Sequence, residues 1–327
     1  MDDMLENCPL NQTIGDNLVR AWSKINNPNY KNVVMSVSGG ADSDDMLDII
    51  WRIDKSNKCK YIWFDTGLEY QATKDHLKYL EQKYGISIIR YRPKKTIPTS
   101  CKENGQPFLS KNVSEMIRRL QAHNFLWEDK SFDELMVEYP NCKSALEWWC
   151  NAKPSKAHNI SQNKWLKEFM ISNPPQFYIS NLCCKHAKKD VAHQVIKDYE
   201  VDLEITGIRK AEGGARATAY KSCFDCHDSR NYDRYRPLFW YKNDDKSEYE
   251  AFYIIEHSKC YSEYGLPRTG CAGCPFGRDF EYELEVIKEH EPKLFNAVNF
   301  IFGQSYEYTR KYRKFCEEMN KKQKENK

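Results

Sequence analysis

A short run of small and polar residues has the composition of a phosphate-binding loop. It reads Ser38-Gly39-Gly40-Ala41-Asp42-Ser43. Two adjacent glycines let the backbone turn sharply and bring its N–H groups close to an anion, because no Cβ atom stands in the way. The hydroxyl groups of Ser38 and Ser43 can donate hydrogen bonds to phosphate oxygens, and the Asp42 carboxylate can help to hold Mg²⁺. The sequence therefore predicts a site for nucleotide phosphates.

The residues around this loop indicate how it is positioned. Residues 32–37 form a compact apolar run with several β-branched side chains, and apolar residues recur at helical spacing between Met46 and Ile53. A buried strand would then lead into the loop, and a helix would begin near Asp42. The helix would direct unpaired N–H groups and the positive end of its dipole at bound phosphates. Ser36, near the end of the strand, is a further expected contact.

Two more acidic residues follow the loop directly. Asp44 and Asp45 place negative charge beside the expected phosphates. They would favour a helix N-terminus through its dipole or recruit a second metal ion, but they would repel bare phosphate. We therefore expect nucleotide binding to require Mg²⁺.

Strand and helix patterns alternate on either side of a central stretch. We expect helices at residues 73–84 and 185–199 and strands at residues 60–64, 86–89, 177–180 and 203–207. This alternation predicts an α/β fold with a parallel sheet covered by helices. Ligands of such sheets bind at the C-terminal ends of the strands. Asp65-Thr66-Gly67 follows one of these strands, so these residues are expected to meet the phosphate loop.

The same patterns divide the chain into five predicted segments. Residues 1–30 form a helical lead-in, and residues 31–99 form the first part of a nucleotide-binding domain. Residues 100–176 are mostly helical in pattern and form an insertion. The nucleotide-binding domain resumes at residues 177–220, and residues 221–327 form a Cys-rich metal-binding region with C-terminal helices.

The six residues of the phosphate loop match the PP-loop signature Ser-Gly-Gly-x-Asp-Ser, and the chain resembles the ATP pyrophosphatase superfamily that carries it. The lysine of a Walker loop is absent. The resemblance implies a Rossmann-like fold of the adenine nucleotide alpha-hydrolase type. It also implies that ATP is cleaved between its α- and β-phosphates and that AMP passes to an oxygen that is later displaced. Asp42 and Ser43 would be catalytic residues.

Two other stretches are similar to the phosphoadenosine phosphosulfate (PAPS) reductase family of this superfamily. Residues 63–70 contain its Asp-Thr-Gly-x-Glu loop, and residues 206–212 contain its Thr-Gly-x-Arg segment, with Arg216 following. The resemblance covers roughly residues 30–280. It implies that Gly207 lies at the nucleotide, that Arg209 and Arg216 grip phosphate or sulfate, and that Arg209 is also catalytic. A guanidinium group suits this task because it binds oxyanions bidentately.

The chain contains 13 cysteines, more than packing alone requires. Cys183 and Cys184 are adjacent, and Cys271 and Cys274 form a Cys-x-x-Cys motif. Family members with a [4Fe–4S] cluster use this combination, so the resemblance implies a cluster held by these four thiolates, with zinc as the alternative. The residues alone leave other ligand sets open, which would include Cys223, Cys226 or Cys260.

The end of the chain distinguishes between branches of the family. The reductases attack sulfate with a cysteine in a Glu-Cys-Gly-x-His segment, whereas Cys316 lies in Lys-Phe-Cys-Glu-Glu beside basic residues that would lower its pKa. The intact loop favours ATP as the substrate. We therefore expect an enzyme that adenylates an acceptor for sulfur transfer, similar to DndC-like DNA phosphorothioation enzymes or tRNA thiolases. A sulfonucleotide reductase is the alternative.

A protein that binds nucleic acid without catalysing a reaction is the alternative from another functional class. Structural zinc would then stabilise a nucleic-acid-binding module that uses Lys164, Trp165, Lys167 and residues 308–313. A net charge of +3 over 327 residues is nearly balanced, so it does not by itself indicate nucleic acid.

The start of the chain is acidic, and no apolar run approaches the ~20 residues that span a bilayer. We therefore expect a cytoplasmic protein with reduced cysteines and no membrane partner. The expected partners are an adenine nucleotide, a DNA or tRNA acceptor, and a sulfur-donor protein such as a cysteine desulfurase.

Overall fold

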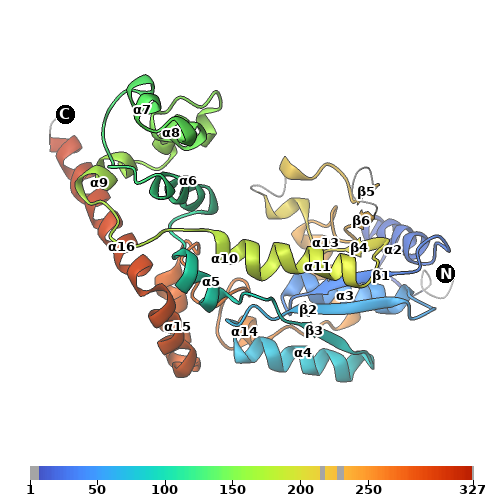
Figure 1. The fold of residues 1–327 in the computed structure, drawn as a ribbon. Helices are drawn as coiled ribbons and strands as arrows, with labels where there is room; N and C mark the ends of the chain where they lie inside the picture. The colour runs from blue at the N-terminus through green and yellow to red at the C-terminus, as the bar shows by residue number, and fades with distance from the viewer. Residues whose placement is uncertain (1–6, 214–217, 227–231, 326–327) are drawn as a thin grey trace. The chain divides into compact units, whose positions relative to one another are not determined.

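The computed structural model describes residues 7–213, 218–226 and 232–325 (Figure 1). Its contacts divide the chain into two compact units. The first unit comprises Met1–Pro93 and Lys188–Cys271, and the second comprises Lys94–Ala187 and Ala272–Lys327. Each unit thus combines two separate parts of the sequence. The sequence analysis drew its boundaries elsewhere, because local patterns do not show that C-terminal helices pack with the middle of the chain.

A six-stranded sheet forms the centre of the first unit. Its strands are β1 (Val33–Val37), β2 (Cys59–Phe64), β3 (Ile88–Tyr91), β4 (Leu203–Ile205), β5 (Phe224–Asp225) and β6 (Asp233–Tyr235). Their order is β3-β2-β1-β4-β6-β5, and every neighbouring pair is parallel except β5 with β6. The predicted Rossmann-like α/β fold is confirmed. The strand order reverses between β1 and β4, which is the position where such sheets bind ligands.

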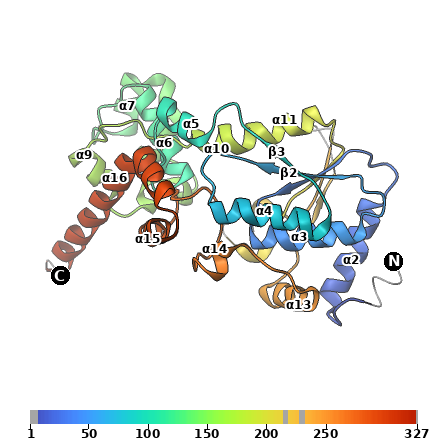
Figure 2. The ribbon, with the colours of Figure 1, turned by 90° about the horizontal axis from the view of Figure 1, so that it is seen from below.

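Helices cover both faces of this sheet. They are α2 (Gln12–Ile25), α3 (Ala41–Ile53), α4 (Gln71–Tyr84), α11 (Asp190–Asp198), η5 (Lys210–Glu212), α13 (Asn243–Tyr253) and α14 (Lys259–Ser262). Alternate residues of β1 point to opposite faces. Met35 packs with α2, α3 and α4, whereas Val34 packs with α11. Figure 2 shows α11 on one side of the sheet and α3 and α4 on the other.

The second unit is helical. Its elements are α5 (Ile97–Asn104), α6 (Lys111–Ala122), α7 (Phe132–Glu138), η1 (Pro140–Cys142), α8 (Lys143–Trp149), η2 (Lys156–His158), η3 (Ile160–Gln162), α9 (Leu166–Ser172), α10 (Leu182–Cys184), α15 (Phe280–His290) and α16 (Pro292–Glu325). The π-helical turn η4 (Lys185–Lys189) follows α10 in the chain. Trp148, Trp149 and Phe169 are fully buried in the core of this unit, against Tyr308 and Tyr312 of α16.

The strand predicted at residues 177–180 is wrong. Ile179 forms an isolated β-bridge with Gln106 in the second unit and does not join the sheet. The side chain of Gln121 accepts a hydrogen bond from the Ile179 amide at 2.9 Å and donates one to the Phe177 carbonyl at 2.8 Å. These backbone groups are satisfied by a helix side chain, so the apolar run needs no partner strand.

No helix in the described ranges combines the length and the apolar character that a membrane crossing would require.

Candidate functional site

The predicted phosphate loop lies between β1 and α3. Gly39 has a φ of +67°, and a Cβ atom there would lie 2.9 Å from Thr73, so this turn requires glycine. The buried Ser43 hydroxyl accepts a hydrogen bond from the Ser38 amide at 2.9 Å and closes the loop from inside. The Ser38 side chain is exposed, whereas Ser36 is half-buried within β1. The loop therefore has the turn geometry that the sequence predicted.

A second loop meets the first at the point where the strand order reverses. Gly207 follows β4, and a Cβ atom there would lie 3.4 Å from the Asp42 carbonyl oxygen. A segment that the sequence analysis did not single out also reaches this loop. The Tyr261 hydroxyl accepts a hydrogen bond from the Ala41 amide at 3.0 Å, at the first residue of α3. A hydroxyl oxygen thus occupies part of the helix N-terminus, where an anion oxygen can also bind.

The Asp42 carboxylate lies between two cationic side chains. Arg209 Nε is 3.0 Å from one carboxylate oxygen, and Lys246 Nζ is 3.2 Å from the other. Arg209 also donates to Asn243 at 3.1 Å. The structure therefore places Arg209 at the loop, as the sequence predicted, and adds Lys246 from α13, which the sequence analysis missed. The predicted contact Arg216 lies outside the described residues.

Asp44 and Asp45 do not face the predicted phosphate loop, and this corrects the sequence analysis. Both are fully buried. Asp44 contacts His76 at 3.0 Å and His257 at 2.9 Å, and Asp45 contacts Lys246 at 2.5 Å. Spacing along α3 turns these carboxylates away from the loop and toward cationic partners from distant parts of the first unit. Their charge is therefore compensated inside the fold. Asp45, Glu250 and His257 also place one possible ligand atom each within 4.8 Å of one another, and this group could hold a metal ion.

The network around these carboxylates shifts the pKa values of its members. Glu250 contacts both Lys246 at 2.5 Å and His257 at 2.8 Å. Burial opposes the charge on His257, but hydrogen bonds to Asp44 and Glu250 raise its pKa to about 9. Burial also opposes the charge on Glu250, yet His257 and Lys246 lower its pKa to about 2. Burial raises the pKa of Asp45 to about 8 against the effect of Lys246.

These shifts predict that stability falls as the pH rises from 6.5 to 9. A histidine whose pKa is raised by folding stabilises the protein fully below its unfolded pKa of about 6.5, and this contribution is lost as the pH passes its folded value of about 9. The buried Asp45 carboxyl acts in the same direction, because its ionisation is penalised by burial. His257→Gln should flatten the decline of the melting temperature by several degrees, as measured by calorimetry. Exposed His123→Gln should retain the wild-type profile, and an unchanged slope in His257→Gln would contradict the assignment.

Asp65 holds two arginines at the ends of the strands. Its carboxylate is 2.7 Å from Arg90 Nε and 3.3 Å from Arg92 Nε. Burial opposes its ionisation, but hydrogen bonds from Arg90 and from the Gly67 amide keep its pKa below the ordinary value. The arginine side chains remain 55% and 68% exposed. Asp65 thus acts here as an anchor for cations. Arg90 and Arg92 were missed, although they follow the same strand-end rule that identified Asp65.

The rest of the Asp-Thr-Gly-x-Glu segment forms a tight buried turn. The Glu69 carboxylate accepts hydrogen bonds from the amides of Thr66 at 3.0 Å and Gly67 at 3.2 Å. Thr66 Oγ1 lies 3.8 Å from the Cys271 Sγ atom, within the first unit. The turn therefore orders Thr66 and Gly67, and it brings one cysteine of the Cys-x-x-Cys motif against this segment.

The predicted metal ligands are shared between the units. Cys271 belongs to the first unit, and Cys183, Cys184 and Cys274 belong to the second. Neighbouring thiols and burial raise the pKa of the Cys183 thiol above its ordinary value. Clustered thiols fit a metal centre that prefers thiolates, which a [4Fe–4S] cluster and zinc both do. Cys260, an open alternative, is buried 3.6 Å from Thr73 in the first unit.

Cys316 is a packed thiol. Its sulfur donates to the Lys164 carbonyl at 3.5 Å, and burial raises its pKa. The basic neighbours in sequence were expected to lower this pKa, but the packing of α16 outweighs them. This environment does not suit a sulfate-attacking thiolate.

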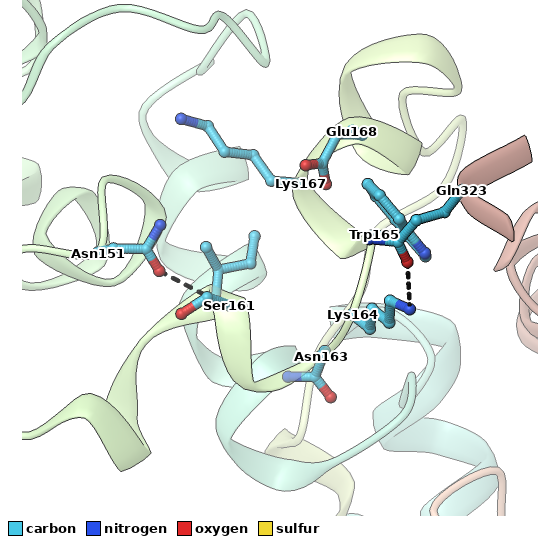
Figure 3. A pocket seen from close by; sticks show the side chains of 9 residues that line it. Asn151, Ser161, Asn163, Lys164, Trp165, Lys167, Glu168 and Gln323 are labelled. Atoms are coloured by element: carbon cyan, nitrogen blue, oxygen red, sulfur yellow. Dashed lines mark hydrogen bonds between the residues drawn. The ribbon is translucent and has the colours of Figure 1, made fainter. Parts of the chain in front are cut away.

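The residues suggested for nucleic-acid binding divide into two groups. Tyr308 and Tyr312 are core residues, each 8% exposed, because their spacing places both on the buried face of α16. Lys164, Trp165 and Lys167 line a surface pocket (Figure 3). Lys164 donates to Gln323 at 3.1 Å and Lys167 to Asp129 at 2.5 Å, so both lysines are engaged within the unit.

Comparison with known proteins bears on the predicted family. Residues 32–137 match the phosphoadenosine phosphosulfate reductase domain. The match contains the PP-loop and the Asp65 segment, and it confirms the resemblance predicted from the sequence. No curated protein matches the chain.

Two solved structures are similar at 14% sequence identity. One is the phosphoadenylyl-sulfate (PAPS) reductase from Candida auris in a phosphate complex, with a TM-score of 0.42, covering 83% of this chain and 93% of that one. The other is the U34-tRNA thiolase NcsA from Methanococcus maripaludis with its [4Fe–4S] cluster, with a TM-score of 0.40, covering 93% of this chain and 79% of that one.

Proposed function

We propose that this protein is an enzyme that binds ATP with Mg²⁺ and transfers its AMP to an acceptor oxygen, which sulfur then replaces. One observation carries the proposal. The intact Ser-Gly-Gly-x-Asp-Ser loop lies where the strand order reverses, with Asp42 held by Arg209 and Lys246. A loop with this turn, a helix N-terminus and adjacent cations is suited to a polyphosphate.

The phosphates would contact groups from three strand ends. The loop after β1 offers the exposed Ser38 hydroxyl and backbone N–H groups. Arg209 follows β4, and Arg90 and Arg92 lie at the end of β3. Because Asp65 fixes the arginines of β3 while leaving them exposed, they are available to an anion. These cations would offset the charge of a triphosphate.

Asp42 is the residue that would hold Mg²⁺. Its side chain is 21% exposed and belongs to the loop itself, whereas Asp44 and Asp45 are fully buried. Mg²⁺ would supply charge neutralisation between phosphate oxygens. Arg209 and Lys246, which pair with Asp42 in this structure, would then be available to the phosphates.

The positive groups around the expected phosphates suit a two-step reaction. The acceptor oxygen attacks the α-phosphorus of ATP, the bond to the bridging oxygen breaks, and pyrophosphate leaves with the bonding electrons. Positive groups placed around the phosphates stabilise the charge that builds up on the leaving group. A sulfur nucleophile, brought by a sulfur-donor protein, then bonds to the adenylated centre, and AMP leaves. A cluster bound by the cysteines would supply a thiophilic metal centre to this chemistry.

A sulfonucleotide reductase is the second candidate, favoured by the domain that residues 32–137 match. Nucleotide affinity separates the two functions. Calorimetric titration of the anaerobic wild-type protein should show tighter binding of ATP with Mg²⁺ than of PAPS, and chelation of Mg²⁺ should weaken ATP binding at least tenfold. Tighter binding of PAPS, together with sulfite release in the presence of thioredoxin, would support the reductase and overturn the proposal.

A further inference from the structure

The second unit has a surface pocket whose lining combines an indole ring with amide and lysine side chains. Its polar lining residues include Asn151, Asn163, Lys164, Trp165, Lys167 and Gln323, all from this unit. The volume of the pocket is about 240 Å³, which is below the roughly 300–1,000 Å³ of pockets that enclose a whole small-molecule ligand. A pocket of this size suits one ring of a larger ligand.

The backbone presents Trp165 at this pocket in an unusual conformation. Its φ is +62° and its ψ is 9°, in the left-handed region that bulky residues rarely adopt. The next residue, Leu166, is fully buried and begins α9, while the half-buried indole donates from Nε1 to Asn320 at 3.1 Å. Strained residues of this kind gather at ligand sites. The conformation and the partly exposed ring together point to a role in binding.

Lys164 places a positive charge beside the indole. Its Nζ atom donates to Asn320 at 2.6 Å and to Gln323 at 3.1 Å, and it lies 5.3 Å from the centroid of the indole ring. Both hydrogen-bond partners are neutral amides, so they do not compensate the charge, whereas Asp129 balances Lys167 at 2.5 Å. Lys164 is also exposed, so its charge attracts anions.

Amide side chains line the pocket on both sides. Asn151 and Ser161 lie on one side, and Trp165 and Gln323 lie on the other (Figure 3). The Asn151 side-chain oxygen accepts a hydrogen bond from the Ser161 amide at 3.1 Å, which orients this carboxamide. A carboxamide both donates and accepts hydrogen bonds, and so do the edges of nucleobases. The lining thus combines a surface for stacking with groups that match the polar edge of a base.

The two segments that supply the lining are strongly basic. Residues 151–168 and 319–325 contain seven lysines and two glutamates, one of which, Glu168, also lines the pocket. The exposed lysines at the end of α16 are Lys321, Lys322 and Lys324. Gln323, in the same turn of α16, reaches the pocket. Positive charge therefore extends from the pocket along the end of α16, which is complementary to a strand of phosphates.

We propose that this pocket binds one unpaired base of a single-stranded nucleic acid. The base stacks on Trp165 and the amides contact its polar edge, while Lys164 and the lysines at the end of α16 contact the phosphates of the strand. The proposal rests on the proposed function for one point only, that this strand is the acceptor. Binding itself needs neither ATP nor a metal centre, so it is tested without them.

Fluorescence anisotropy of a labelled strand of about 12 nucleotides measures this binding. Wild-type protein should bind the single strand more tightly than a duplex of the same sequence. Trp165→Ala should raise the Kd about 5–100-fold, the scale of losing one base–aromatic stack, whereas Trp165→Phe should retain most of the affinity because it keeps a ring. Lys164→Gln should reduce the slope of log Kd against log salt concentration by about 0.7, since one phosphate contact is lost.

Trp127 provides the matched control for the tryptophan. It is a half-buried residue of the same unit with a φ of +59°, but its ring packs against Phe125 and Trp149. Trp127→Ala should therefore leave the affinity for the strand within about twofold of wild type. Lys288→Gln, which removes an exposed lysine of α15, should leave the salt slope unchanged. Circular dichroism establishes that each variant is folded.

Wild-type affinity in Trp165→Ala, or an equal loss in Trp127→Ala, would overturn the assignment of the pocket. Tighter binding of the duplex than of the single strand would overturn the unpaired base. A protein that cleaves ATP but binds the strand independently of Trp165 would contradict only the pocket. A protein that binds the strand through Trp165 but does not cleave ATP would count against the proposed function and leave the pocket intact.

Discussion

Lys246→Met should lower the free energy of unfolding by about 3–5 kcal/mol, the usual cost of removing one partner from a buried ion pair. The Lys246 ammonium lies 2.5 Å from both Asp45 and Glu250 and 3.2 Å from Asp42. Its side chain is 13% exposed, and that of Asp45 is fully buried. Methionine keeps most of the side-chain volume but, above the Asp45 pKa of about 8, leaves the Asp45 carboxylate without this counter-ion, so the loss is electrostatic.

Urea denaturation at pH 9, where Asp45 is ionised, measures this loss of stability, and two further variants show its origin. Lys78→Met removes an exposed ammonium that pairs with Asp75 at 3.6 Å, and it should cost less than about 1 kcal/mol. The double variant Lys246→Met/Asp45→Asn should recover part of the stability, because the buried group is then neutral. Equal losses in the two single variants, or no recovery in the double variant, would show that the network does not depend on this charge.

Asp42→Asn should lower ATP turnover by about 10²–10³-fold, the scale of losing one preorganised electrostatic group at a reacting phosphate. The amide has the size of the carboxylate, so the loop should keep its shape. It lacks the charge that would hold Mg²⁺ and position Arg209, which lies 3.0 Å away. Steady-state release of pyrophosphate at several Mg²⁺ concentrations gives the measurement, with an expected loss mainly in kcat.

Asp244→Asn is the matched control for this change. Asp244 is an exposed carboxylate in the first turn of α13, the helix that carries Lys246. Its replacement should leave turnover within twofold of wild type. Turnover by Asp42→Asn at the level of this control would mean that the loop does not place Asp42 at the reacting phosphates.

The centre of the sheet and the phosphate loop could be predicted because their signals are local. The apolar run before Ser38 and the paired glycines report directly on a strand and a turn, and the structure has both. The strand expected at residues 177–180 has an equally apolar pattern. These residues do not join the sheet because their backbone groups form hydrogen bonds with the side chain of Gln121, which precedes them by more than fifty residues.

The acidic residues after the loop show a second limit of prediction from the sequence. Asp44 and Asp45 were read as charges beside the phosphates, but their partners are His76, Lys246 and His257. Sequence spacing shows which residues share a helix face but does not show what packs against that face. A lysine on a distant helix therefore could not be assigned to the site from the sequence.

Arg90 and Arg92, in contrast, could have been predicted from the sequence. They lie at the end of a strand that was correctly expected, next to the strand that Asp65 follows. Extending the strand-end rule to this third strand would have found them.

The bond that is broken in ATP provides the most direct test of this account. Wild-type protein is incubated anaerobically with Mg²⁺, a tRNA or DNA acceptor, a sulfide source and ATP labelled in its γ-phosphate, and the labelled products are separated by chromatography. Cleavage between the α- and β-phosphates predicts labelled pyrophosphate with an equal amount of AMP. Labelled inorganic phosphate with ADP, in the absence of labelled pyrophosphate, would contradict the account.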